Sequence, residues 1–150
     1  MPRTARGRML WGSISTSERV NRLSLKAALL YTWLLPHADD QGRMSGSPAT
    51  IKAVVVPMQR DITESEILGL LDEIEIQSLI TLFVAEEKRS NTINPEDFIL
   101  QINDWWDYQA LREPKASRFP PPSGWNKDRV ESQTRDNSGR YQRPEHELKK

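Results

Sequence analysis

The stretch that decides the fold is residues 62–84, ITESEILGLLDEIEIQSLITLFV, in which a helical pattern gives way to a strand pattern. Thr63 and Glu66 stand at the spacing of a capping box, in which each residue satisfies a free backbone N–H of the first helical turn. Ile62 and Ile67 stand where a hydrophobic staple would place its two side chains. The stretch therefore predicts a helix that begins after Thr63.

The same stretch also predicts where this helix buries its side chains and where it ends. Its apolar residues recur at helical spacing as Ile67, Leu70, Leu71 and Ile74. From Ile80 the residues are aliphatic, β-branched or aromatic, which favours a strand. We therefore expect a helix to about Ser78, a strand over 80–84, a polar loop over 86–95 and a second strand over 98–102. Residues 105–109 pack on the core or begin a short helix.

Three shorter helices are predicted upstream. Ser15 and Glu18 have capping-box spacing, and Ser24 is the expected N-cap of a helix that reaches about Leu35. Ser47-Pro48 predicts a further helix, which Pro57 ends. The buried stripe expected on the helix after Ser24 consists of Leu25, Ala28, Leu29, Thr32 and Leu35.

The order of these elements predicts an α+β, mostly helical fold. A helix, a turn, a short helix and a longer helix precede a strand, a loop and a strand. This is the arrangement of a winged helix-turn-helix with a two-stranded β-hairpin as its wing. Residues 37–43, HADDQGR, lie between two of the helices and read as a polar turn in which Gly42 supplies a positive φ.

The 150 residues divide into three parts. We expect a basic flexible arm over 1–10, the winged-helix domain over 11–112, and a largely disordered tail rich in proline and charge over 113–150. The tail holds few large apolar side chains and cannot bury enough surface to offset its ordering entropy.

Composition limits the compartment and the chemistry. The chain has no cysteine, no apolar run near the ~20 residues of a membrane span, and no apolar signal-peptide core behind its arginine-rich start. We therefore expect a cytoplasmic protein without membrane contact. His37 beside Asp39 and Asp40 is better explained as a turn than as a metal site, because adjacent side chains do not converge on one ion. No metal, cofactor or catalytic residue is expected, and an enzyme such as a nuclease is disfavoured.

Several segments together resemble the N-terminal winged-helix domain of phage replication-initiator and replisome-organiser proteins and of DnaD-like primosome proteins. The resemblance covers roughly residues 8–122. It implies a DNA-associated protein of a phage or prophage, acting in the cytoplasm of the host bacterium beside other replication proteins. The segments that carry it are 24–31 (SLKAALLY), 34–43 (LLPHADDQGR), 47–52 (SPATIK) with Pro57, 70–74 (LLDEI) with Leu79-Ile80, 102–105 (INDW) with Gln109, and 115–120 (KASRFP).

The zero net charge conceals a strong segregation. Residues 1–60 hold nine Lys and Arg against three Asp and Glu, residues 61–110 hold two against twelve, and residues 111–150 hold ten against six. Residues 61–79, which include the helix expected to enter the major groove, contain no base. Its carboxylates would oppose the phosphate contacts on which DNA affinity depends. We therefore expect this helix to face a protein, through Glu64, Asp72, Glu73 and Glu75.

DNA contacts are expected instead from the arm, the short third helix, the wing and the tail. The candidate residues are Arg3, Arg6, Arg8, Lys52, Arg60, Lys88, Arg89, Lys115 and Arg118, with Lys127 and Arg129 further along the tail. Tryptophans 11, 33, 105 and 106 are a lesser candidate set for stacking on single-stranded DNA. Two alternatives stay open beside a DNA-binding replication accessory: a protein-interaction or oligomerisation module, and a transcriptional regulator.

Overall fold

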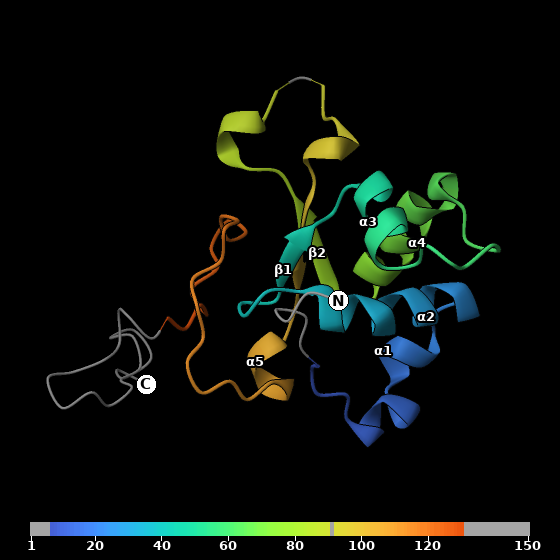
Figure 1. Cartoon of the computed structure of the whole chain (residues 1–150), viewed down its shortest axis with the longest axis horizontal. Coiled ribbons are helices and arrows are strands. Elements are labelled where there is room, and N and C mark those ends of the chain that lie inside the picture. The colour runs from blue at the N-terminus through green and yellow to red at the C-terminus, as the bar shows by residue number, and fades with distance from the viewer. Residues whose placement is uncertain (1–6, 91, 131–150) are drawn as a thin grey trace, which may run out of the picture.

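A computed structural model describes residues 7–90 and 92–130 of the chain, which form an α+β domain (Figure 1). About 42% of these residues are helical, and a small antiparallel sheet crosses the domain. The α-helices are α1 (Glu18–Asn21), α2 (Leu25–Leu34), α3 (Pro48–Val54), α4 (Glu64–Ile76) and α5 (Trp105–Tyr108), and the strands are β1 (Arg43–Ser45), β2 (Ile80–Phe83) and β3 (Ile99–Ile102). Short 3₁₀ turns are η1 (Gly12–Thr16), η2 (Leu35–His37), η3 (Glu86–Lys88) and η4 (Pro95–Asp97).

The sheet has three strands in the order β1-β3-β2, one more than the expected hairpin. β2 and β3 pair as expected, with Ile80 opposite Ile102. β1 pairs with the other edge of β3 through Arg43 and Gln101, Met44 and Leu100, and Ser45 and Ile99. β1 could not be predicted from the sequence, because three residues are too few to establish an alternating pattern and the first of them is an arginine.

The helices cover one face of this sheet (Figure 1). The long helix α4 begins as predicted: the Thr63 N–H donates to Glu66 Oε1 at 3.0 Å, and the staple residues Ile62 and Ile67 are both buried. The four predicted core side chains of α4 are all buried. They pack with Met44, Ile80, Leu100 and Ile102 of the sheet in the main apolar core.

The buried face of α2 differs from the predicted stripe. Its buried residues are Ala27, Leu30, Tyr31 and Leu34, and Leu25 is 91% exposed. Residues 27–31 are apolar without interruption, so two stripes with helical spacing fit the same sequence. The N-cap is nevertheless correct, because Ser24 Oγ accepts from the Ala27 N–H. In α1, Ser17 rather than Ser15 is the cap.

The second face of the sheet is covered by residues 110–130, called here the covering segment. Gln101 projects towards this face from the central strand and is fully buried, as is Arg43 beside it. Figure 1 shows the covering segment in orange, on the side of the sheet away from the helices. Residues 113–130, the first part of the predicted tail, lie against the domain: the Lys115 and Arg129 backbones are hydrogen-bonded to Asp40 and Gln41, and Val130 is buried. Residues 131–150 lie outside the described part of the chain.

The part of the expected arm that the structure describes is attached to the domain. The Met9 N–H donates to Gln109 Oε1 at 2.9 Å, and Gln109 Nε2 donates back to the Met9 carbonyl at 3.0 Å. A domain boundary at residue 11 thus divides paired residues. Within 7–90 and 92–130, none of the helices has the length and apolar character required to traverse a bilayer.

Gly42 makes the predicted turn possible, and its replacement tests the fold. Its φ is +82°, and an added Cβ would lie 2.8 Å from two ring atoms of Trp105. We expect Gly42→Ala to lower the free energy of unfolding by about 2–4 kcal/mol, because it adds left-handed strain to overpacking. Thermal and urea unfolding measure this.

Gly69→Ala is the matched control, because Gly69 lies within α4 and an added Cβ there meets nothing within 4 Å. It should stabilise the protein by about 0.5–1 kcal/mol, the helix preference of Ala over Gly. Equal effects of the two substitutions would contradict the close packing of Gly42 on Trp105.

Candidate functional site

The turn between η2 and β1 ties distant segments of the chain together through its two carboxylates. Asp39 Oδ1 accepts from the backbone N–H groups of Gln41 and Arg43, and its Oδ2 accepts from the Ser117 hydroxyl. Asp40 Oδ1 pairs with Arg8 at 3.1 Å, and its Oδ2 accepts from the Lys115 N–H at 3.0 Å. These aspartates are therefore structural acceptors that hold the N-terminal residues and the covering segment.

Gln41 holds the two ends of the covering segment next to each other. Its Nε2 donates to the carbonyls of Lys115, at 2.8 Å, and Arg129, at 2.6 Å. Its Oε1 accepts from the Arg129 N–H at 2.9 Å. One fully buried side chain thus brings together backbone positions that are fourteen residues apart in sequence.

Arg43 anchors the same segment through charge. Its guanidinium, 1% exposed, donates to both carboxylate oxygens of Asp128 and to Gln101 Oε1 at 2.9 Å. Gln101 Nε2 in turn donates to the Gln41 carbonyl. Because a buried arginine is costly without a partner, Asp128 fixes the position of the segment over the sheet and is neutralised in doing so.

The covering segment presents bases and aromatic rings together. It contains five bases and two carboxylates, those of Glu113 and Asp128. The Asp128 carboxylate is paired with Arg43. Lys127 lies 5.1 Å from the Trp125 ring centroid, Arg118 lies 6.0 Å from that of Phe119, and Arg129 lies 4.9 Å from that of Trp106. The five bases are Arg112, Lys115, Arg118, Lys127 and Arg129.

A shallow groove of about 330 Å³ opens where the covering segment leaves α5. Arg112 and Arg129 lie on its wall with the indole of Trp106, whose buried Nε1 has no hydrogen-bond partner within the described residues. A groove that combines guanidinium groups and an aromatic side chain suits phosphate and base contacts better than an apolar ligand.

The arm and the third helix contribute less than the sequence predicted. Arg3 and Arg6 lie outside the described residues. Arg8 is used by the fold: its side chain is 8% exposed, donates to the Ala38 carbonyl, pairs with Asp40 and lies 5.4 Å from the Trp105 ring. Lys52 Nζ donates to the carbonyls of Val56 and Gln59, at 2.9 and 2.7 Å, and so closes the end of α3.

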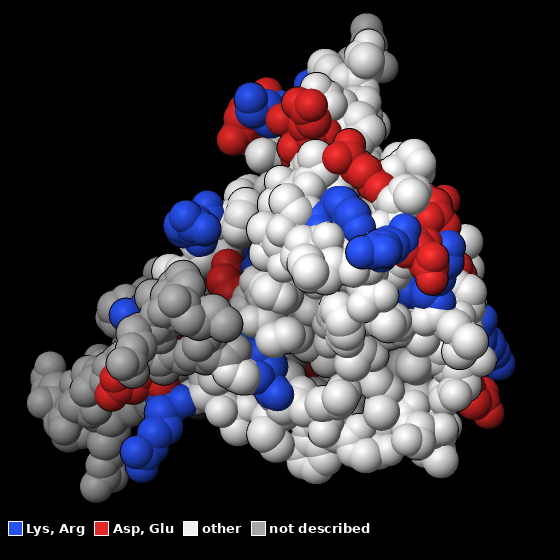
Figure 2. All heavy atoms as spheres, turned by 45° about the vertical axis from the view of Figure 1, so that its right-hand side comes forward, with Lys and Arg blue, Asp and Glu red and all other residues white. Residues whose placement is uncertain are grey.

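Three candidate bases remain exposed away from the covering segment. Arg60 lies on the loop before α4, and Lys88 and Arg89 lie at and beside η3 in the β2–β3 loop. That loop also carries Glu86, Glu87, Glu96 and Asp97, so its four acids outnumber its two bases. Figure 2 shows red and blue side chains mixed over the loop at the top of the molecule.

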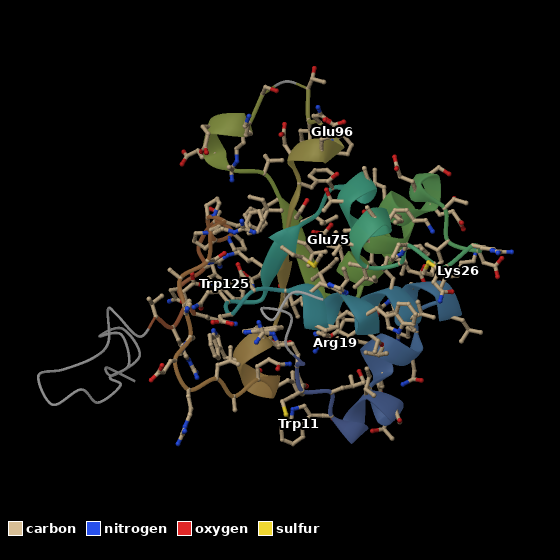
Figure 3. The ribbon with its side chains drawn as sticks, in the orientation of Figure 1. Trp11, Arg19, Lys26, Glu75, Glu96 and Trp125 are labelled. Carbon is tan, nitrogen blue, oxygen red and sulfur yellow. The ribbon has the colours of Figure 1, made fainter. Side chains whose placement is uncertain are left out.

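The carboxylates predicted to form a protein interface on α4 divide into two groups. Glu73 accepts from the backbone N–H and hydroxyl of Ser24, and Glu75 Oε2 accepts from the Leu82 N–H at 2.8 Å, so both hold α4 to its neighbours (Figure 3 labels Glu75). Glu64 and Asp72 are exposed.

Glu66, which was not among the predicted interface residues, is also held within the domain. Hydrogen bonds from Lys26 and from the Thr63 backbone lower its pKa to about 2. It therefore stays ionised far below neutral pH and carries a full negative charge on α4 under ordinary conditions.

The tryptophans have different environments. Trp105 is 1% exposed and belongs to the core, whereas Trp11 and Trp33 are 50% and 40% exposed. Trp11 Nε1 donates to the Tyr108 carbonyl at 2.8 Å, which ties it to the wall of the domain. Of the four, Trp106 is the one that the structure places beside the bases of the covering segment.

Sequence reasoning missed the four residues that build this surface: Gln41, Arg43, Gln101 and Asp128. A weak signal was present at Gln101, which interrupts the apolar strand Ile99–Ile102. Among the described residues, no group of three or more potential ligands is placed to hold a metal ion, His37, Asp39 and Asp40 included.

The attachment of the covering segment is testable at Asp128. Asp128→Ala leaves the buried Arg43 guanidinium without its carboxylate. We expect a loss of about 2 kcal/mol in unfolding free energy, below the ~3–5 kcal/mol of a fully buried pair because Asp128 is 30% exposed. Trypsin should also cut faster after Lys127 and Arg129. Thermal melts and timed digestion measure the two effects.

Asp72→Ala is the control, an exposed aspartate on α4 whose removal should change stability by no more than about 0.5 kcal/mol. If Asp128→Ala melts and is digested like the unsubstituted protein, the Arg43–Asp128 pair does not hold the segment.

No protein-family model matches this chain, no curated protein matches it, and no solved structure matches it.

Proposed function

We propose that this protein is a non-enzymatic DNA-binding module with a winged-helix fold, and that it contacts DNA through the covering segment. The observation that carries the proposal is the separation of charge in the folded domain. The covering segment holds five bases, and one of its two carboxylates is paired with a buried arginine. The helix α4 holds five carboxylates and no base.

The arrangement of elements supports the winged-helix part of the proposal. Along the chain, α2, β1, α3, α4, β2 and β3 follow one another, and the three strands form one antiparallel sheet with the helices on one face. A helix-turn-helix pair followed by a strand, a loop and a strand is the order that such domains have. The loop between β2 and β3 is the wing in this interpretation.

Electrostatics argue against the usual use of α4 as a reading helix. Phosphates carry one negative charge per ~1.7 Å of duplex, and each contact with Lys or Arg releases condensed counterions. The exposed Glu64 and Asp72, with the ionised Glu66, would bring like charge to the groove. The covering segment offers the opposite charge, and its exposed Lys115, Arg118 and Lys127 are available without unfolding any helix.

The biological setting of the proposal rests on the resemblance described above. It places the protein with phage or prophage replication accessories in a bacterial cytoplasm, with replication proteins as partners. Regulation of transcription uses the same DNA contacts, and the genes encoded beside this one would separate the two roles.

The decisive experiment compares two variants of equal net charge. The first variant, Lys115→Gln/Arg118→Gln/Lys127→Gln, removes three exposed bases from the covering segment. The second, Arg60→Gln/Lys88→Gln/Arg89→Gln, removes three exposed bases from the loop before α4 and from the β2–β3 loop. We expect the first to weaken DNA binding and to lower the salt slope of log K by about 0.9 for each duplex phosphate that is no longer neutralised. The second should bind nearly as the unsubstituted protein does. Fluorescence anisotropy at several salt concentrations gives both quantities.

Three outcomes would overturn parts of this proposal. Equal weakening in the two variants would mean that the net charge, and not the covering segment, governs binding. Weakening confined to the second variant would assign DNA to the wing. No binding by the unsubstituted protein at low salt would remove DNA as a ligand altogether.

A second candidate function, protein interaction through α4, is favoured by a separate observation. Ile76 is 76% exposed and Leu68 is 37% exposed on the outer face of α4, beside the exposed Asp72. Large exposed apolar side chains that share a helix face with acids are typical of an interaction surface.

Two variants of α4 test this second function. Glu64→Gln/Asp72→Asn should leave DNA binding unchanged or slightly tighter, because it removes negative charge without touching the covering segment. Ile76→Gln should reduce any self-association seen by sedimentation. Weaker DNA binding by the acidic-residue variant would contradict the assignment of surfaces.

A further inference from the structure

The outward side of α4 carries a row of exposed side chains, called here the outer ridge. Glu64, Leu68, Asp72 and Ile76 recur every four residues, and all four are exposed, Ile76 by 76% and Leu68 by 37%. Residues four apart on a helix are neighbours and form a continuous ridge on its surface. The outer ridge therefore alternates a carboxylate with an aliphatic side chain over the whole length of α4.

The two carboxylates of the outer ridge are not used by the fold. Within residues 7–90 and 92–130, Glu64 and Asp72 take part in none of the five ion pairs. Lys26, a base on the adjacent helix α2, is engaged by Glu66 at 2.9 Å. The outer ridge thus offers two unpaired anions between apolar side chains, and a partner that covers it must supply bases.

The covering segment presents the complementary chemistry on the other side of the sheet (Figure 1). Lys115 and Arg118 are exposed, and so are two prolines that follow them at 120 and 121. The segment is attached here through the Lys115 N–H, which donates to Asp40, and through the Ser117 hydroxyl, which donates to Asp39. Neither basic side chain takes part in that attachment, so both are available to another molecule.

The two surfaces also match in spacing. Glu64 and Asp72 lie about 12 Å apart along the axis of α4, at ~1.5 Å per residue. Lys115 and Arg118 are separated by three residues outside any helix, and an extended chain spans at most about 10–11 Å over that distance. Because lysine and arginine side chains are long, two bases at this separation can reach both carboxylates of the outer ridge at once.

We propose that the outer ridge binds the covering segment of a second copy of this protein. The two carboxylates pair with Lys115 and Arg118 of the other copy, and the aliphatic side chains of the ridge contact its exposed prolines. Because the two surfaces lie on opposite sides of the domain, the contact is heterologous, and copies join head to tail. The inference rests on the proposed interaction through α4 and names the partner.

This assembly competes with DNA, because the proposed function assigns the same two bases to phosphates. A duplex carries one negative charge per ~1.7 Å, a denser array than the two carboxylates of the outer ridge. A short duplex added to the assembled protein should therefore dissociate it into single copies bound to DNA. Self-association in the absence of DNA keeps the bases covered.

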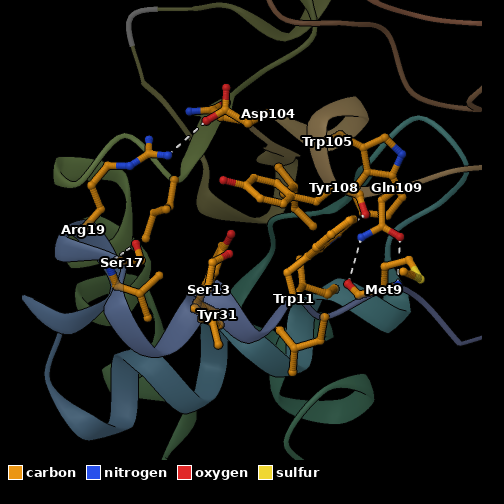
Figure 4. Close-up of a pocket in the computed structure, with 17 residues that line it drawn as sticks. Met9, Trp11, Ser13, Ser17, Arg19, Tyr31, Asp104, Trp105, Tyr108 and Gln109 are labelled. Carbon is orange, nitrogen blue, oxygen red and sulfur yellow. Dashed lines mark hydrogen bonds and ion pairs between the residues drawn. The ribbon is translucent and has the colours of Figure 1, made fainter.

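A different exposed apolar surface supplies the control. Met9 and Trp11 are each 50% exposed beside a small pocket of about 70 Å³ (Figure 4). The two charged residues of its lining, Arg19 and Asp104, pair with each other at 3.1 Å. Met9→Gln makes this surface polar and keeps the hydrogen bonds to Gln109, which use the Met9 backbone.

Sedimentation velocity at low salt, without DNA, tests the pairing. The unsubstituted protein should form dimers and longer assemblies as its concentration rises. Glu64→Lys/Asp72→Lys and Lys115→Glu/Arg118→Glu should each weaken association about tenfold or more, since each replaces two ion pairs by like charges. An equimolar mixture of the two should associate again, because the reversed surfaces complement each other. Met9→Gln should associate as the unsubstituted protein does, and thermal melts show that each variant is folded.

The inference fails if the unsubstituted protein stays monomeric, if Lys115→Glu/Arg118→Glu associates as before, or if mixing the two folded variants restores nothing. Loss of association in Met9→Gln would assign the contact to the other surface. Self-association that needs the outer ridge but not the covering segment would leave the interaction through α4 standing and overturn only its partner. A protein that assembles in this way and binds no DNA would overturn the DNA proposal alone.

Discussion

The hydrogen bonds of one turn, residues 39–43, are the constraint on which the rest of the structure depends. Four of its five residues carry polar side chains, and Gln41 and Arg43 are buried almost completely. Buried polar groups that lack partners cost about 1–3 kcal/mol each, so the chain must bring them partners. It does so from the N-terminal residues, from the central strand and from the covering segment. The second face of the sheet is therefore closed by polar contacts, whereas the first is closed by an ordinary apolar core.

This arrangement also determines which charges are left for other molecules. Arg8, Arg43 and Lys52 are bases in the sequence but serve the fold, as do Glu73 and Glu75 among the acids. When these residues are left out of the count, the remaining exposed bases are still concentrated in the covering segment, apart from the acids of α4. The covering segment keeps its exposed bases because its backbone, and not its basic side chains, makes most of the contacts with the turn. A segment that is attached through its backbone can present its side chains outward.

The elements that the sequence predicted correctly are those specified by local chemistry. The start of α4, the cap of α2 at Ser24, the helix at Ser47-Pro48 and the positive φ of Gly42 each depend on residues within a few positions of each other. The errors concern long-range choices. The buried face of α2 is the one that packs against α4, and β1 is recognised as a strand by its pairing with β3, which is distant in sequence. The attachment of the covering segment depends on Gln41 and Arg43, which lie about ninety residues away. Disorder over 113–150 was predicted from the few large apolar side chains of that stretch. That criterion takes no account of the polar contacts by which Gln41 and Arg43 hold residues 115–129.

The position of Asp40 has a mechanical consequence. One of its carboxylate oxygens holds Arg8 and the other holds the backbone of Lys115, so a single side chain connects the N-terminal residues with the covering segment. The neighbouring Gln41 and Arg43 hold Arg129 and Asp128 at the far end of that segment. The shortest chain of contacts between residue 8 and residue 129 therefore runs through this one turn and not through the helices. A pull on the two ends of the described chain would be transmitted through the turn before it reached the helical core.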